Sequence, residues 1–214
     1  GNLAYVANTK DTFRTSFGSL NIVDVSDPTN LVRVGAFNVN SDINAVAVAG
    51  NRAYLARGYA EPLGLSILDI SNPAAPTLLG YYGSYYVTGH GTDVAVVGSR
   101  AYLAAGASLR VFDVSIPATP MLLGGWTNIY GSEEVSVAGD FAYFGSSGLH
   151  VINISNPTSC VRVGGATGPS SGVTLAGNLL YLSSGQGFRI YDVSNPSNVV
   201  LRANNYLGNI LDFT

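Results

Sequence analysis

Gly50-Asn-Arg-Ala-Tyr-Leu-Ala56 is the segment from which the fold follows, because the chain repeats it. The same pattern of a glycine, two variable residues, a small or apolar residue and a tyrosine also begins at Gly1, Gly98, Gly139 and Gly177. Alternation of apolar and aromatic residues after a Gly-polar turn is typical of a β-strand. Repetition at a steady spacing indicates an array of similar structural units. We therefore interpret the chain as five copies of one unit.

A second block follows each copy of the first. Asp69-Ile-Ser-Asn-Pro73 has counterparts that begin at Asp24, Asp113, Asn153 and Asp192. Successive blocks are 45, 44, 40 and 39 residues apart, and about 40–45 residues is the length of a four-stranded propeller blade. Proline cannot donate to a strand ladder, whereas Asp and Ser bond nearby backbone groups, so this block predicts a turn.

Each unit divides into four short strands. In the second unit these are Val46–Val48, Ala53–Leu55, Leu65–Asp69 and Leu78–Gly80. No part of the chain has a helical period of useful length. The sequence thus predicts an all-β fold, a five-bladed β-propeller of four-stranded antiparallel blades that forms a single domain over residues 1–214.

The two ends of the chain match each other. Leu211-Asp-Phe-Thr214 has the pattern of Val46-Ala-Val-Ala49, and Gly50 corresponds to Gly1. We therefore expect the C-terminal segment to supply the first strand of the blade whose other strands lie in residues 1–35. This pairing closes the ring and removes two open sheet edges. A piece of a larger ring is the alternative.

These units resemble the LVIVD repeat, which is named for a strand such as Leu20-Asn-Ile-Val-Asp24. The resemblance covers essentially the whole chain, and it departs from the repeat at Asn153 and Leu180, where the repeat has Asp and Ala. It implies a propeller fold. Proteins with this repeat are mostly bacterial or archaeal, often exported and mostly without an assigned activity, so the resemblance supplies no catalytic residue.

Composition excludes several classes of partner and site. The net charge is −3 and no basic run occurs, which argues against nucleic acid. Hydrophobic residues make up 47% of the chain in short runs, so no transmembrane segment is expected. Cys160 is the sole cysteine, which excludes an internal disulfide and a thiolate metal cage. The single lysine and the abundance of Gly, Ser, Asn and Thr favour an extracellular or cell-surface protein, with a cytosolic one as the alternative. The chain itself contains no signal peptide.

Variable loops on one face of the ring are the expected place for a binding site, because binding residues concentrate on loops that a rigid scaffold holds. The uneven ones are Asn8–Ser19, Tyr81–Asp93 and Gly125–Glu134. Aromatic rings there suit a protein partner or a glycan. The candidate ligand-binding residues are Tyr59, Tyr85, Tyr86, His90, Trp126 and Tyr130. Tyr81 and Tyr82 end a strand, and we expect them to pack between blades.

Acidic side chains gather in register near the expected rim of the channel. They are Asp42, Asp93, Glu133 and Glu134. Rings of oxygen ligands suit Ca²⁺, but no spaced calcium motif is present, and a solvated rim is the simpler interpretation. We expect no cofactor, with Ca²⁺ as the one weak candidate.

No catalytic constellation is apparent. His90 lacks a Gly-x-Ser-x-Gly nucleophile nearby, and we expect His150 to be a packed histidine of a third strand. The leading hypothesis is a non-catalytic propeller that binds a protein or a glycan through its loop-rich face. One alternative is a glycosidase-like hydrolase that uses Glu133, Glu134 and Asp93. The other is a structural subunit of a larger surface assembly.

Overall fold

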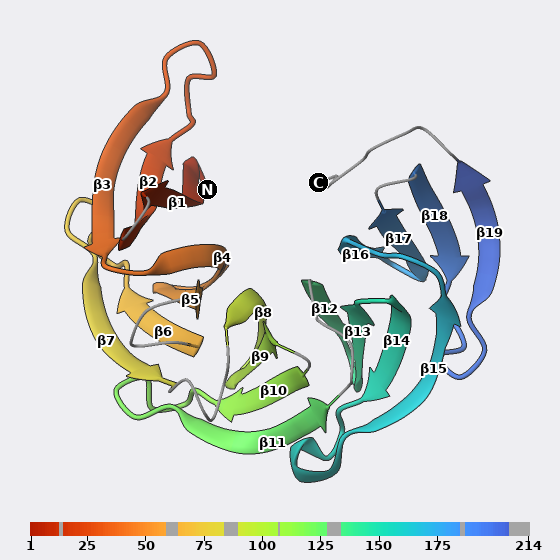
Figure 1. Cartoon of the computed structure of the whole chain (residues 1–214). Coiled ribbons are helices and arrows are strands. Elements are labelled where there is room, and N and C mark those ends of the chain that lie inside the picture. The colour runs from red at the N-terminus through yellow and green to blue at the C-terminus, as the bar shows by residue number, and fades with distance from the viewer. Residues whose placement is uncertain are drawn as a thin grey trace. The chain divides into compact units, whose positions relative to one another are not determined.

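The computed structural model describes residues 1–12, 15–58, 64–83, 90–106, 108–127, 134–184 and 187–205, without the side chains of residues 10–12, 15 and 16. Over these ranges the chain forms five antiparallel sheets, and the one helical element is a 3₁₀ turn, η1 (Pro157–Ser159). Figure 1 shows the strands of each sheet side by side in chain order. The all-β prediction is therefore confirmed.

The first two sheets follow one another along the chain. The first contains β1 (Leu3–Thr12), β2 (Thr15–Asp24) and β3 (Val32–Val39), and the second contains β4 (Asp42–Ala49), β5 (Arg52–Gly58), β6 (Gly64–Asp69) and β7 (Thr77–Tyr82). The repeated tyrosine lies in mid-strand, since Tyr54 pairs with Ala47 on one side and Ile67 on the other.

The remaining three sheets repeat this order. Their strands are β8 (Gly91–Val97), β9 (Arg100–Ala105), β10 (Ser108–Asp113) and β11 (Met121–Thr127); β12 (Glu134–Ala138), β13 (Phe141–Gly145), β14 (Gly148–Asn153) and β15 (Val161–Thr167); and β16 (Gly172–Ala176), β17 (Leu179–Ser184), β18 (Gly187–Asp192) and β19 (Val200–Asn205).

Four of the sheets have the predicted four strands, and the first has three among the described residues. The segment predicted to complete it, Leu211–Thr214, lies outside the described residues. The sheets do not close within the described part, so closure of the ring is not confirmed.

The chain divides into two compact units. One consists of residues 1–103 and 112–122, and the other of residues 104–111 and 123–214. In the first, Leu20, Ile22, Leu55 and Leu68 form a buried cluster between the first and second sheets. In the other, Leu149, Val151, Leu180 and Leu182 belong to a corresponding cluster between the fourth and fifth sheets.

The Asp-x-Ser-x-Pro block forms the predicted turn in all five repeats, directly after β2, β6, β10, β14 and β18. In each turn the backbone N–H of the serine donates to the side-chain oxygen of the residue two positions earlier, for example Ser71 to Asp69 over 2.8 Å. The same bond, 2.8–3.0 Å long, joins Ser26 to Asp24, Ser115 to Asp113, Ser155 to Asn153 and Ser194 to Asp192. Asn153 thus accepts the same hydrogen bond as the four aspartates, although its side chain is uncharged.

A glycine in the fourth strand lets the next sheet approach. A Cβ at Gly80 would overlap the carbonyl oxygen of Pro117 in the following turn. The same relation holds for Gly35 with Pro73, Gly124 with Pro157 and Gly164 with Pro196. The turns of the second to fifth sheets therefore lie directly against the backbone of the preceding sheet, which explains the glycine in β3, β7, β11 and β15.

Within the described residues, no neighbouring sheet covers β19 or the residue after the turn aspartate of the first sheet. Val25, which follows the turn aspartate of the first sheet, is 37% exposed, whereas its counterpart Ile70 is 4% exposed. Every residue of β19 is exposed. In β19, Ala203 stands where the other fourth strands have the glycine that contacts the next turn. It pairs with Ile190 as Gly164 pairs with Val151.

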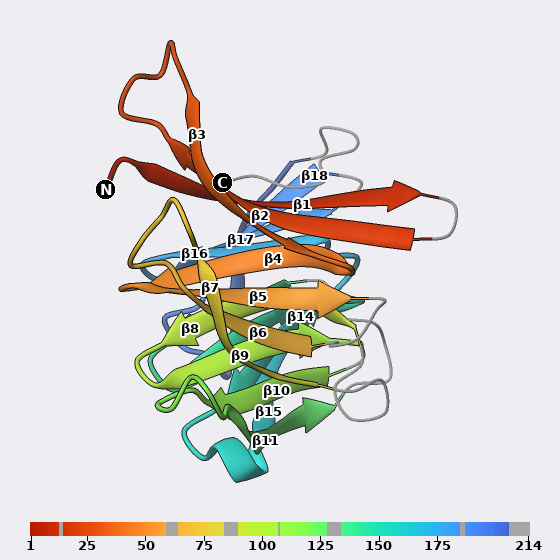
Figure 2. The ribbon, with the colours of Figure 1, turned by 90° about the vertical axis from the view of Figure 1, so that its left-hand side faces the viewer.

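One predicted loop is wrong. The sequence predicts a loop over Asn8–Ser19, but Asn8–Thr12 belong to β1 and Thr15–Ser19 belong to β2, and the ladder continues to the pair Thr12 and Thr15. Figure 2 shows these two strands extending past β4 and β5. Extended backbone pairing accommodates polar residues when one face of a hairpin is open to solvent, so the polar composition of this segment concealed two strands.

Candidate binding face

Buried polar side chains of the described residues lie at one end of the sheets. This end, called the loop end here, is where a second strand leads into the third and a fourth strand leads into the next first strand. The buried polar residues are Ser41, Asp42, Arg57, Ser66, Ser108, Ser146, His150, Ser170, Ser183 and Ser184. The opposite end carries the uniform Asp-x-Ser-x-Pro turns, so chemical variety is concentrated at the loop end.

Arg57 is the one buried arginine among the described residues, and it is 4% exposed. It lies near the end of β5, where its Nε donates to Ser41 Oγ over 2.9 Å and its Nη1 donates to Ser66 Oγ over 3.3 Å. Burial lowers the pKa of Arg57, because a low-dielectric surrounding disfavours the charged guanidinium.

Asp42, a predicted rim residue, is buried rather than solvated. It begins β4 opposite Gly58, is 5% exposed, and its Oδ1 makes no hydrogen bond with the described residues. A buried carboxylate oxygen without a donor is costly. The expectation of a simple solvated rim is therefore wrong at this position.

Two other predicted acidic residues accept backbone hydrogen bonds. Glu134 Oε2 accepts the backbone N–H of Val173 over 2.7 Å, which connects β12 to β16. Asp93 Oδ1 accepts the N–H of Val94 over 2.8 Å. Glu133 lies outside the described residues. Because Glu134 satisfies a backbone donor of the neighbouring sheet, its first role is structural.

Trp126 packs in the second unit. Its ring lies 6.0 Å from that of Phe144 in an edge-to-face arrangement and 5.2 Å from that of His150. His150 is buried in β14 as predicted, with its Nε2 3.1 Å from Ser146 Oγ. Burial, and then the nearby charge of Arg162, lower the pKa of His150. Packing thus accounts for the buried part of the Trp126 ring.

The structure describes few of the other predicted aromatic residues. Tyr59, Tyr85, Tyr86 and Tyr130 lie outside the described residues. His90 is half-buried and directly precedes β8. The expectation for the two strand-end tyrosines is half confirmed, since Tyr82 contacts Phe112 with ring centroids 5.1 Å apart, whereas Tyr81 is exposed.

A pocket lined by both amide and apolar groups lies at the loop end of the first sheet. It has a volume of about 400 Å³, and it is lined by Asn8, Phe17, Gly18, Ser19, Asn38, Val39 and Asn40. The Phe17 side chain is 48% exposed, so its ring is available to a ligand. Amides that donate and accept, next to an exposed aromatic ring, suit a ligand that has both hydroxyl groups and an apolar face.

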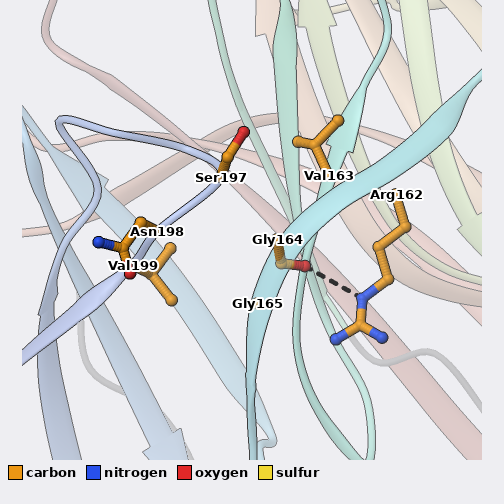
Figure 3. A pocket seen from close by; sticks show the side chains of 7 residues that line it. All are labelled: Arg162, Val163, Gly164, Gly165, Ser197, Asn198 and Val199. Atoms are coloured by element: carbon orange, nitrogen blue, oxygen red, sulfur yellow. Dashed lines mark hydrogen bonds between the residues drawn. The ribbon is translucent and has the colours of Figure 1, made fainter.

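A second pocket lies where a turn packs on a fourth strand. It measures about 380 Å³ and involves Arg162, whose Nε donates to the Gly164 carbonyl over 3.0 Å (Figure 3). The residues Ser197–Val199 form its other wall. A similar pocket occurs beside Pro117 in the first unit. Both pockets occur where such a turn meets a fourth strand, so the repeat itself produces them.

No group of three or more His, Cys, Asp or Glu side chains among the described residues gathers as metal ligands would. A Ca²⁺ site at the rim would therefore need ligands from elsewhere in the chain. In the same part of the chain, no helix has the length and apolar character needed to cross a bilayer.

The sequence prediction missed Arg57 and the amides of the first-sheet pocket. One signal was available for Arg57, since the same position of the other repeats holds Asn8, Ala105, Ser146 and Ser184. An arginine that replaces small or neutral residues at one repeat indicates a local role. The pocket had no such signal, because its residues were assigned to a loop.

Comparison with known proteins gives a family and a fold. A model of the LVIVD repeat matches residues 1–39, 42–84, 88–127, 131–165 and 167–206. No curated protein matches the chain. Solved structures include 416 similar chains, so the likeness identifies a widely used fold.

One similar structure is the crystal structure of the computationally designed Ika8 protein. It has a TM-score of 0.69 and 11% sequence identity, and the match covers 96% of this chain. The chain spans 64% of the length of that designed protein. At this identity the likeness concerns the fold alone.

Proposed function

The chain belongs to the LVIVD-repeat family, and from that premise we propose that it is a non-catalytic five-bladed β-propeller that binds a glycan or a protein at its loop end. The repeat and the five antiparallel sheets support the propeller. Closure of the ring and the identity of the ligand are parts of the proposal.

Uncovered apolar residues of the first sheet support closure. Val6 is 47% exposed, whereas its counterpart in the second repeat, Leu55, is fully buried. Val25 differs from Ile70 in the same way. Leu55 and Ile70 are buried because the preceding sheet covers them. In a closed ring the last sheet would cover Val6 and Val25, with Leu211–Thr214 as the missing strand beside β1.

The amide-lined pocket beside Phe17 is the observation that favours binding of a glycan. Its volume of about 400 Å³ lies within the usual range for small-ligand sites, about 300–1,000 Å³. A stable protein partner would instead need about 800 Å² of surface on each side. A sugar ring can stack on Phe17 while Asn8, Asn38 and Asn40 exchange hydrogen bonds with its hydroxyl groups.

A glycan array tests this function. We expect the wild-type protein to bind a defined set of glycans, and we expect Phe17→Ala to weaken that binding at least tenfold. Ile116→Ala is the matched control, because Ile116 is also an exposed apolar residue but lies in a turn at the other end of the sheets. Equal binding by Phe17→Ala and the wild type would reject this pocket.

A protein partner is tested in a second arm. Tyr85 and Tyr86 remain candidate contacts, so a Tyr85→Ala/Tyr86→Ala variant should lose a partner that the wild type retains in a pull-down. Trp126 is omitted from this variant because its ring packs on Phe144 and His150. A cell-surface location, supported by composition alone, belongs to the same proposal.

A further inference from the structure

The charge of Arg57 is buried without a compensating negative charge among the described residues. Its two hydrogen-bond acceptors are the neutral hydroxyls of Ser41 and Ser66, and its Nη2 makes no hydrogen bond within the described part of the chain. The ion pair between Arg202 and Asp192 does not involve Arg57. An isolated buried charge is among the most unfavourable features that a fold can contain.

Asp42 does not neutralise this cation. Asp42 and Arg57 are near one another in the β4–β5 ladder, where Asp42 is opposite Gly58, yet they form no ion pair. Burial lowers the pKa of Arg57, and no carboxylate of the described residues contributes to this shift. A nearby carboxylate would act in the opposite direction, since a negative charge favours the protonated guanidinium.

The fold itself does not require a cation at this position. The equivalent residues Asn8, Ala105, Ser146 and Ser184 carry no charge, and their sheets have the same strand order. Arg57 also continues the face of β5 that carries Ala53 and Leu55, which belong to the cluster between the first and second sheets. The Arg57 guanidinium therefore follows this apolar cluster along β5, on the side of the loop end.

We propose that Arg57 and Ser66 bind the carboxylate of an acidic sugar at the loop end. The guanidinium has a planar set of donors that matches a carboxylate, and Nη2 is available for it. Ser66 Oγ accepts from Arg57, which leaves its own O–H to donate to an anion. Ser41 Oγ instead donates to the Asp42 carbonyl over 3.3 Å, so Ser41 orients the arginine.

This inference rests on the proposed glycan binding, because it assigns a charge to the ligand. Asn40, which lines the pocket of the first sheet, directly precedes Ser41. The amide-lined pocket and the buried cation thus lie at the same end of one compact unit. A bound carboxylate would supply the counter-charge that the described residues do not.

Denaturation in the presence of anions tests the proposal on the whole chain. The probes are sodium glucuronate, sodium acetate and uncharged glucose, with sodium chloride used to hold the ionic strength constant. A ligand that binds only the folded state raises the unfolding midpoint in proportion to the logarithm of its concentration above Kd. We expect glucuronate to raise the wild-type midpoint and glucose to have a much smaller effect.

Three variants complete the test. Arg57→Met removes the charge at similar length, so it should abolish the glucuronate effect and be at least as stable as the wild type without anion. Arg57→Lys keeps the charge but not the planar fork, so we expect at least tenfold weaker binding. Arg52→Met is the matched control, because Arg52 lies at the other end of β5, and it should keep the full effect.

The outcomes distinguish a sugar carboxylate from any other carboxylate. They also distinguish failure of the Arg57 site from failure of glycan binding. An acetate effect equal to that of glucuronate would support the carboxylate site but overturn the assignment to a sugar. A wild type that responds to no anion, with Arg57→Met less stable in every buffer, would show that Arg57 is structural and overturn the site. Equal responses of wild type and Arg57→Met would also overturn it. The Phe17→Ala array is a separate test of glycan binding.

Discussion

The turn aspartates illustrate how a single side chain fixes local structure in every repeat. Each accepts the N–H of the serine two residues later. Hydrogen bonds from the serine side chain, and then from its N–H, lower the pKa of Asp69 and Asp113 below the ordinary value. The N–H bond of Ser26 is the largest cause of the same shift in Asp24. The hydrogen bond from Arg202 is the largest cause of the same shift in Asp192. The motif predicted these turns because all of their contacts are local.

The lowered pKa values predict sensitivity to acid. A carboxyl group whose pKa is lower in the folded state stabilises the protein above its unfolded pKa of about 3.9, and that stabilisation is lost as pH falls through the folded value. Asp69→Asn should keep the turn, as Asn153 does, and lose less stability than the wild type between about pH 5 and pH 2.

Urea unfolding across that range measures the difference. Asp140→Asn is the control, because Asp140 is an exposed turn residue whose carboxylate makes no hydrogen bond with the described residues. It should follow the wild type. A wild type whose stability is constant down to the lowest pH would show that the turn carboxylates do not contribute.

Glu134 carries a second prediction for a single residue. Glu134→Ala removes the acceptor of the Val173 N–H, and an unsatisfied backbone donor costs about 1–3 kcal/mol. Glu134→Gln keeps an acceptor oxygen and should cost less. Chemical denaturation measures both values. Equal stability of Glu134→Ala and the wild type would remove the structural role and restore Glu134 as a candidate for the hydrolase alternative.

At the scale of strands and sheets, the same glycine–proline contact joins each sheet to the next. Strands, turns and their order were predictable, because tyrosine, glycine and proline recur at fixed places. The β1–β2 hairpin was not, because its strand pairing does not depend on an alternating apolar pattern. The environment of Arg57 was not predictable either, because Ser41 and Ser66 come from separate segments of the chain.

The close contact between Gly80 and Pro117 predicts that one added methyl group lowers the free energy of unfolding. Gly80→Ala places a Cβ against the Pro117 carbonyl, and forced overpacking of this kind costs about 1–3 kcal/mol. Thr77→Ala, at an exposed position of the same strand, should stay within about 0.5 kcal/mol of the wild type. Both values come from urea unfolding. A tolerated Gly80→Ala would mean that the sheets are not held this closely.

For the whole molecule, the remaining question is whether the last repeat returns to the first. In the proposed closed ring, Ala203 stands where the other fourth strands have glycine, so the closing contact would be wider than the other four. The repeats predict the arrangement within each sheet, but ring closure depends on residues 206–214, which lie outside the described part of the chain. The predicted register pairs Leu211 with Val6, as Val46 pairs with Leu55.

A disulfide between those two positions tests closure of the ring. Residues paired on antiparallel strands have Cα atoms about 4.5–5.5 Å apart, which is within the range for a disulfide of about 4.4–6.8 Å. Val6→Cys and Leu211→Cys, combined with Cys160→Ser, should form a disulfide within one chain on mild oxidation, as judged by non-reducing electrophoresis and free-thiol titration of the monomer. Free thiols, or crosslinks between molecules alone, would contradict closure.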